Sequence, residues 1–106
     1  MATLLTTAVL MLATVQHHDS RLEVVRPYDA KLERMAQCES GKRWWIKKVL
    51  KDGTTYYGGL QFDLSTWRSV GGRGYPHKNS ELEQKYRAVK LIKVRGYAPW
   101  PVCGSA

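Results

Sequence analysis

The residue best suited to acid–base chemistry in this sequence is Glu39, in the stretch Cys38-Glu39-Ser40-Gly41. Apolar residues before it recur at helical spacing, because Leu32 and Met35 follow Tyr28 at i+4 and i+7. Glu39 continues the same stripe at i+11. A carboxyl group on the buried face of a helix has a raised pKa unless a partner neutralises it, and it can then act as a general acid. The alternative is a frayed helix end at which Glu39 is simply solvated.

The elements that must position Glu39 are a helix before it and a hairpin after it. The helix is predicted to start at Pro27 or Tyr28 and to end at Ser40-Gly41. A β-hairpin is predicted over residues 44–60, because two strand-like runs flank the turn dipeptide Asp52-Gly53. Three lysines are expected near its tip: Lys47, Lys48 and Lys51.

Two more helices and an extended tail complete the expected domain. A short helix capped by Asp63 or Ser65 reaches Val70, and a capping box at residues 80–83 opens a long helix over 80–95. On that helix, the residues expected to face the core are Leu82, Tyr86, Val89 and Ile92. Those expected mostly to face water are Lys85, Arg87, Lys90, Lys93 and Arg95. The proline-stiffened tail over 97–103 can return to Cys38, so the predicted fold class is α+β.

The N-terminal segment has the composition of a leader. Residues 2–15 are an apolar run, shorter than the roughly 20 residues that span a bilayer. The run fits the apolar region of a secretory signal, although no Lys or Arg precedes it and no A-x-A site follows. A hydrophobic N-terminal helix that stays on the protein is the alternative. The predicted organisation is a leader over 1–15, a linker over 16–27 and one folded domain over 28–106.

The charge of the chain is strongly basic. The formal net charge is +8, and the segment from Tyr28 onward holds 15 Lys/Arg and 7 Asp/Glu, so the excess belongs to the folded part. A basic surface favours polyanions, such as nucleic acid, anionic lipid or the acidic polymers of a cell wall. A solvated basic face without a partner is the alternative.

The two cysteines, Cys38 and Cys103, are too few for a zinc site, and the three histidines lack ligand spacing. We therefore expect no metal and no cofactor. If the protein is exported, a disulfide is the better interpretation. It would close most of the domain into one loop, which for that length contributes roughly 4 kcal/mol of stability.

Several sequence blocks occur in an order that resembles a known family. The blocks are Cys38-Glu39-Ser40-Gly41, residues 56–63, Ser65-Thr66-Trp67, Gly71-Gly72 and residues 100–104. Together they resemble the catalytic domain of resuscitation-promoting factors, the transglycosylase-like family of actinobacteria and their phages. The resemblance covers about residues 28–104. It implies a small lysozyme-like domain that binds and cleaves the glycan strands of peptidoglycan.

The resemblance also implies roles for individual residues. Glu39 matches the catalytic acid, and Cys38 and Cys103 match the family's disulfide. A lytic transglycosylase with a single glutamate forms a 1,6-anhydro product without water, whereas a muramidase adds water at the same bond. Both reactions pass through an oxocarbenium-like state.

The substrate groove implied by the resemblance contains five matched positions. Asp63 and Thr66 match polar positions of the groove, and Gln61, Trp67 and Tyr57 lie in matching blocks. Asp63 is also the candidate for a second carboxylate. A separation of about 5–5.5 Å from Glu39 would suit a nucleophile and a larger one would suit substrate positioning. The family resemblance favours positioning.

One segment departs from the family pattern. Between Ser40 and Tyr56 this chain is longer and more basic than the family's usual sequence, with five cations: Lys42, Arg43, Lys47, Lys48 and Lys51. These cations suggest contact with anionic cell-wall polymers. They also keep open a non-catalytic cationic binder, although no known nucleic-acid-binding module is recognisable. We expect a monomer that is secreted or cell-wall associated, of bacterial or phage origin.

Overall fold

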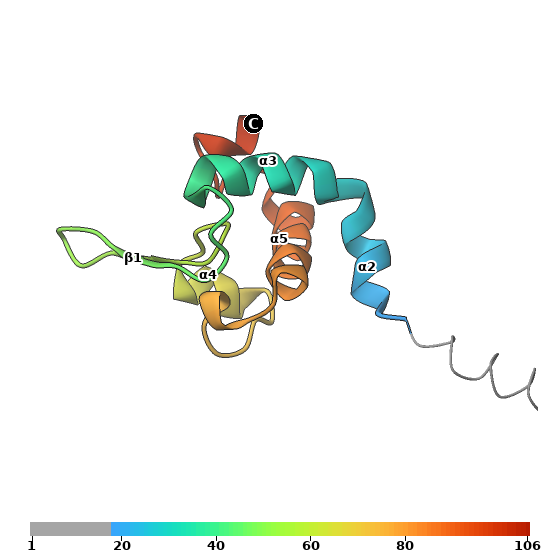
Figure 1. The fold of residues 1–106 in the computed structure, drawn as a ribbon, viewed down its shortest axis with the longest axis horizontal. Helices are drawn as coiled ribbons and strands as arrows, with labels where there is room; N and C mark the ends of the chain where they lie inside the picture. The colour runs from blue at the N-terminus through green and yellow to red at the C-terminus, as the bar shows by residue number, and fades with distance from the viewer. Residues whose placement is uncertain (1–17) are drawn as a thin grey trace, which may run out of the picture.

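The structure, a computed structural model that describes residues 18–106, consists of helices around a short hairpin (Figure 1). The α-helices are α2 (Ser20–Val25), α3 (Asp29–Ser40), α4 (Leu64–Ser69) and α5 (Glu81–Arg95). The hairpin strands are β1 (Lys47–Val49) and β2 (Thr55–Tyr57), and the 3₁₀ turns are η1 (Arg26–Tyr28), η2 (Pro76–Lys78) and η3 (Cys103–Ser105). The α+β prediction is confirmed, and the leader predicted over 1–15 lies outside the described residues. Within residues 18–106, no helix has the length and apolar composition needed to cross a bilayer.

The core lies where α3 crosses α5 (Figure 1). The predicted apolar stripe of α3 is confirmed, because Leu32 and Met35 are fully buried. Within the core, Phe62 makes edge-to-face contacts with Trp67 and with Trp100, at centroid distances of 5.2 and 6.1 Å. Such aromatic contacts add specific geometry to the apolar area that they bury. The remaining buried positions come from α2, α3, the turn after β2 and α5: Val25, Ala36, Leu60, Ala88, Val89, Leu91 and Ile92.

The segment expected to be a linker over 16–27 is structured where it is described. Residues 20–25 form α2, whose N-cap Asp19 accepts a hydrogen bond from the Arg21 backbone N–H at 3.0 Å. Val25 is buried in the core, and the Arg21 guanidinium pairs with Glu83 of α5 at 2.5 Å. Only one side of this short helix packs against the domain, so it carries both polar and apolar residues. That mixed composition led to the prediction of a linker.

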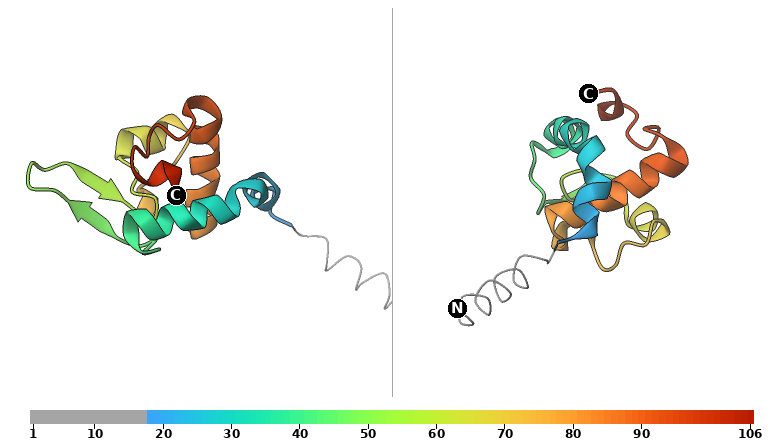
Figure 2. Two further views of the ribbon diagram at one scale, coloured as in Figure 1. Left: turned by 90° about the horizontal axis from the view of Figure 1, so that it is seen from above. Right: turned by 90° about the vertical axis from the view of Figure 1, so that its right-hand side faces the viewer.

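The hairpin is confirmed, with shorter strands than predicted. Its antiparallel register pairs Lys47 with Tyr57 and Lys48 with Tyr56. The expected turn is present, because the Asp52 carboxylate accepts the Thr54 N–H at 2.9 Å. Lys47 pairs with Tyr57 at the inner end of the ladder, so it lies at the base of the hairpin. This corrects the prediction that Lys47 lies near the tip. Figure 2 shows the hairpin projecting well beyond the helices.

Lys85 is buried, which corrects the prediction that it faces water. Its side chain is 7% exposed, and its ammonium contacts Asp29 at 2.7 Å, Glu33 at 2.5 Å and Glu81 at 3.0 Å. Burial would lower the pKa of Lys85, but the three carboxylates outweigh it and raise that pKa. Hydrogen bonding to Lys85 in turn lowers the pKa of Glu33 to about 2. The ion cluster therefore fastens α5 to the first half of α3.

Lys85→Met is expected to lower the free energy of unfolding by about 2 kcal/mol, because it removes charge-assisted hydrogen bonds from carboxylates that water partly screens. Lys93→Met, on the exposed side of α5, is the matched control and should change it by less than about 0.5 kcal/mol. Urea titration at neutral pH measures both. Because the pKa of Glu33 is lowered from its usual 4.5, the cluster's contribution should be lost as pH falls from 4.5 toward 2. Equal stability of the two variants would contradict a structural role for the cluster.

Candidate active site

Glu39 lies in the last turn of α3, and three local features hold that turn in place. The disulfide between Cys38 and Cys103 joins it to the tail, with the two Cα atoms 5.7 Å apart. The buried Ser40 hydroxyl donates to the Gly59 carbonyl at 2.8 Å. Gly41 ends the helix with φ +65°, a conformation that favours glycine, and its N–H donates to the Gln37 carbonyl at 3.0 Å, as in an αL cap. Glu39 is thus presented by a fixed helix end and not by a frayed one.

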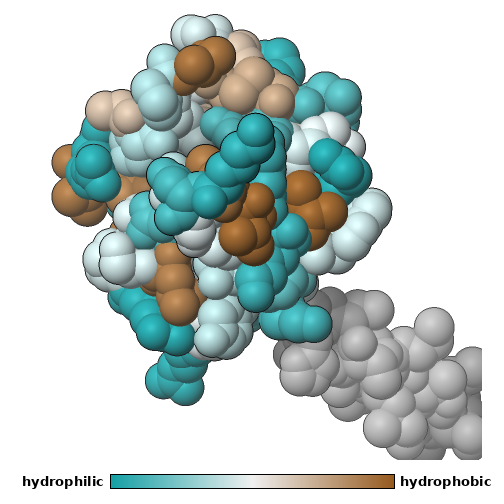
Figure 3. All heavy atoms as spheres, turned by 90° about the vertical axis from the view of Figure 1, so that its left-hand side faces the viewer, coloured by the Kyte–Doolittle hydropathy of each residue, from teal (hydrophilic) through white to brown (hydrophobic). Residues whose placement is uncertain are grey.

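A cavity of about 310 Å³ opens beside Glu39. Three separate segments wall it: the hairpin, the turn at Gln61 and the tail. Figure 3 looks at the molecule from the hairpin side, where hydrophilic and hydrophobic side chains lie next to one another. The lining residues are Glu39, Lys48, Leu50, Tyr56, Gln61, Pro99, Trp100, Pro101, Val102 and Cys103.

The surroundings of Glu39 in this cavity raise its pKa. Partial burial of the carboxyl group raises its pKa above the usual value, and the positive charge of Lys48 opposes part of that rise. No hydrogen bond to the Glu39 carboxyl group is formed within residues 18–106 that would stabilise its charged form. A half-buried carboxyl group of raised pKa beside an open cavity can donate a proton to a bound leaving group.

A second cavity of about 250 Å³ continues from the first, sharing Tyr56, Gln61, Pro99 and Trp100 with it. Asp63 and Thr66 line this second cavity, so the structure brings Asp63, Thr66 and Gln61 into one groove with Glu39. The groove therefore contains four of the six residues predicted for catalysis and substrate binding.

Asp63 is committed to capping α4. Its carboxylate accepts the Thr66 N–H at 2.8 Å, the Thr66 hydroxyl at 2.9 Å and the Ser65 hydroxyl at 3.0 Å. Partial burial would raise the pKa of Asp63, but these hydrogen bonds outweigh it, so the pKa lies below its usual value. A carboxylate held in this way is ionised and oriented, which suits positioning of a ligand better than nucleophilic attack.

Gln61 has a strained backbone at the junction of the two cavities. Its φ of +53° is uncommon for a residue with a side chain. The conformation belongs to a tight turn that is closed by the paired backbones of Tyr57 and Phe62, and the Gln61 amide donates to the Gly58 carbonyl at 3.0 Å. Strain of this kind persists only where surrounding structure enforces it, and it is common at functional sites.

Two predicted groove residues line neither cavity. Trp67 is 0% exposed and packs in the core, where its indole N–H donates to the Arg73 carbonyl at 3.3 Å. Tyr57 is 8% exposed and stacks against Tyr75 and His77. Both belong to the scaffold behind the groove, which corrects the expectation that they line it. Sequence blocks alone could not separate the two roles, because an aromatic ring suits a core as well as a groove.

Several lining residues were not identified from the sequence. Lys48, Leu50 and Tyr56 come from the hairpin, and strand alternation could have placed all three on one face. The tail from Pro99 to Val102 also lines the groove. Its position follows from the disulfide, since residues next to Cys103 must lie beside the residue that follows Cys38. The Trp100 indole anchors this tail by donating to the Leu60 carbonyl at 2.9 Å.

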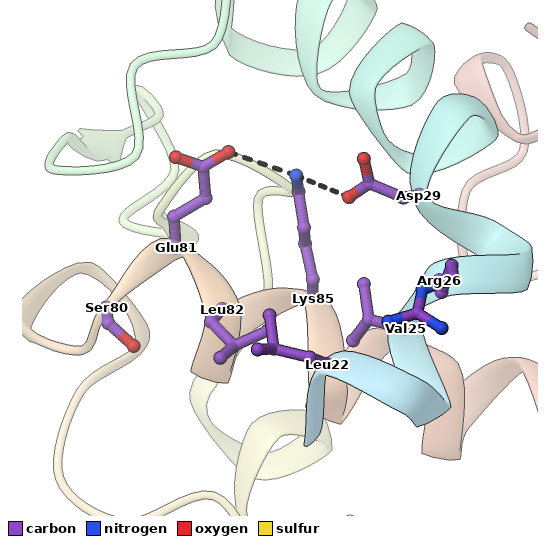
Figure 4. Close-up of a pocket in the computed structure, with 8 residues that line it drawn as sticks. All are labelled: Leu22, Val25, Arg26, Asp29, Ser80, Glu81, Leu82 and Lys85. Atoms are coloured by element: carbon purple, nitrogen blue, oxygen red, sulfur yellow. Dashed lines mark hydrogen bonds and ion pairs between the residues drawn. The ribbon is translucent and has the colours of Figure 1, made fainter. Parts of the chain in front are cut away.

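A larger cavity, of about 530 Å³, lies away from Glu39 between α2 and the start of α5. Figure 4 shows Lys85 reaching between Glu81 and Asp29, with Leu22 and Val25 nearby. The buried ammonium of Lys85 already pairs with Asp29 and Glu81, so Lys85 is not a free acid or base for catalysis. Within residues 18–106, no group of three or more His, Cys, Asp or Glu side chains is arranged to hold a metal ion.

A model of the transglycosylase-like domain family matches residues 26–103. The chain belongs to this family. A resuscitation-promoting factor from Micrococcus luteus is 46% identical over 71 residues, which is 67% of this chain and 30% of that protein. Resuscitation-promoting factor RpfE of Mycobacterium tuberculosis is 42% identical over 77 residues, 73% of this chain and 42% of that protein. The matched region is less than half the length of either relative.

Proposed function

We propose that this protein cleaves the glycan strands of peptidoglycan at the β-1,4 bond between N-acetylmuramic acid and N-acetylglucosamine. The observation that carries the proposal is the half-buried Glu39 carboxyl group, whose pKa is raised beside a continuous groove, in a chain of the transglycosylase-like family. The disulfide between Cys38 and Cys103 fits action outside the cytoplasm. We therefore place the protein in the secreted or cell-wall-associated class, acting as a monomer without a cofactor.

The proposed reaction uses Glu39 twice. Its proton passes to the glycosidic oxygen as the bond from that oxygen to the muramyl C1 breaks, and charge develops on the sugar ring. The substrate's own N-acetyl group stabilises this state. The muramyl 6-hydroxyl then attacks C1 and returns its proton to the Glu39 carboxylate, which leaves a 1,6-anhydro end. Asp63, ionised and fixed at the start of α4, positions the sugar in this scheme.

Mass spectrometry of fragments released from purified cell walls tests the proposal. We expect fragments with 1,6-anhydromuramic ends, each lighter by one water than the product of hydrolysis. Exclusively hydrated reducing ends would instead assign a muramidase-type hydrolase that uses the same acid. Absence of released fragments would overturn cleavage itself.

A non-catalytic cationic binder is the second candidate, because three hairpin lysines take part in no ion pair within residues 18–106: Lys47, Lys48 and Lys51. Such a protein would bind anionic wall polymer or nucleic acid with an affinity that falls steeply as salt rises. Salt-sensitive binding without any cleavage would favour this candidate over the enzyme.

The pH dependence of cleavage should follow the protonation of Glu39. Because the acid must be protonated to donate, kcat/KM is expected to fall as pH rises through its raised pKa. The other ionisable groups lining the cavity are Lys48 and Tyr56. Lys48→Met removes the charge that lowers the Glu39 pKa, so the falling limb should move to higher pH. The shift is tested by measuring kcat/KM of both proteins at constant ionic strength, over pH values on both sides of the falling limb. A limb that stays in place or moves to lower pH would contradict the electrostatic assignment.

A further inference from the structure

The two faces of the hairpin carry different chemistry. Successive strand residues point to opposite faces, and antiparallel partners share a face. Lys48 and its partner Tyr56 share the face that lines the Glu39 cavity. Lys47 and its partner Tyr57 share the other face, where the Lys47 ammonium lies 6.0 Å from the centroid of the Tyr57 ring. The two adjacent lysines therefore lie on opposite faces of the hairpin, and only Lys48 faces the groove.

The charge of Lys48 is available to a ligand. Its neighbours at the base of the hairpin are occupied, because Lys42 pairs with Glu33 at 2.9 Å and the Arg43 guanidinium donates to the Ser40 carbonyl at 2.7 Å. Lys48 takes part in no ion pair with any residue from 18 to 106. An unpaired cation in a binding groove favours an anionic group on the ligand.

The proposed substrate offers one kind of anionic group at this position. N-acetylglucosamine carries no acid, whereas N-acetylmuramic acid carries a lactyl ether whose carboxyl group is either free or extended by a peptide with its own carboxylates. Because Lys48 lines the same cavity as Glu39, it is near the sugar whose bond is cleaved. Both forms of the strand therefore carry a carboxylate on the muramyl substituent, the kind of group that a lysine on this wall pairs with.

We propose that Lys48 is a specificity-determining residue that binds a carboxylate on the muramyl substituent and so selects acid-bearing glycans over uncharged N-acetylglucosamine polymers. This inference rests on the proposed function. It assigns a role to the basic segment between Ser40 and Tyr56, the part of the chain that departs from the family pattern. The negative charge of the bound carboxylate would also offset the positive charge of Lys48, which lowers the Glu39 pKa.

Binding measurements on the full chain test the proposal, with Glu39→Gln present throughout to prevent turnover. The calorimetric ligands are an N-acetylglucosamine oligomer, a peptide-free muramyl glycan of equal length and the same glycan with peptides. Lys48→Met should weaken binding of the carboxylate-bearing ligands about tenfold, the effect of losing one charge-assisted hydrogen bond, and change the uncharged oligomer less than about twofold. Lys48→Arg should restore most of the affinity. Lys47→Met, one residue away on the opposite face, should leave all three ligands within about twofold.

Each outcome of this experiment decides a separate point. A selective loss with the peptide-free glycan identifies the lactyl carboxylate, and one confined to the peptide-bearing glycan identifies a peptide carboxylate. An equal loss for the uncharged oligomer, or an equal effect of Lys47→Met, would overturn the assignment to Lys48. The proposed function fails separately, if the unmodified chain releases no fragments from cell walls.

Discussion

Glu39→Gln is expected to lower the rate of glycan cleavage by about 10²–10⁴-fold, the usual contribution of a positioned general acid. Glutamine has nearly the same shape as glutamic acid and cannot donate a proton to the leaving oxygen. No other carboxylate lines the Glu39 cavity in the described part of the chain, and Asp63 in the adjoining cavity is held in its ionised form by Thr66 and Ser65. No neighbouring acid can therefore replace the lost proton donor.

The same variant should be at least as stable as the unmodified protein at neutral pH. Partial burial raises the folded-state pKa of Glu39 above its usual 4.5, so the folded state binds this proton more tightly than the unfolded state does. Stability from this group is therefore lost as pH rises through the folded-state pKa. A neutral glutamine avoids that loss. Thermal unfolding at acidic and neutral pH should show the largest gain at neutral pH.

Glu23→Gln provides the matched control, because that carboxylate lies on α2 with a side chain 65% exposed. It should change neither the cleavage rate nor the melting temperature appreciably. Cleavage by Glu39→Gln at the unmodified rate would remove Glu39 from the mechanism. A Glu39→Gln protein that is inactive but as stable as the unmodified protein would support Glu39 as the acid. The loss of activity would then not be explained by a loss of stability.

Removal of the disulfide is expected to lower the free energy of unfolding by roughly 4 kcal/mol, the loop entropy for cysteines 65 residues apart. The double variant Cys38→Ser/Cys103→Ser tests this in urea titrations with and without reductant. Reductant should destabilise the unmodified protein by a similar amount and leave the double variant unchanged. For a domain of this size, that loss is a large fraction of total stability.

Activity should fall further than unfolding alone explains. Cys38 immediately precedes Glu39, and the tail that ends at Cys103 forms one wall of the groove. Without the disulfide, the end of α3 and this wall are free to move apart. Cleavage is therefore compared at low temperature, where circular dichroism shows the double variant still folded. A folded double variant with the unmodified rate would limit the disulfide to a stabilising role.

Local patterns in the sequence were sufficient for the elements that carry the site. The stripe of Leu32 and Met35 predicted α3, and Asp52-Gly53 predicted the hairpin turn. Ser80 caps α5 as expected by accepting the Glu83 N–H at 3.1 Å. Each of these features depends on residues a few positions apart, whose interactions are set by backbone geometry. The blocks that resemble the family contain Glu39, Asp63 and Thr66, which the structure places in one groove.

The tertiary structure alone decided which side chains reach the groove and which support it. Trp67 and Lys85 are buried because α4 and α5 pack against segments far away in the chain, and α2 is ordered because α5 offers it a surface. Lys48 lines the Glu39 cavity because one face of the hairpin and the tail form walls of the same cavity. Burial is a property of neighbours brought together from distant positions, and local spacing contains no information about those neighbours. The sequence therefore predicted Glu39 as the acid, and the packing of distant segments determined its surroundings.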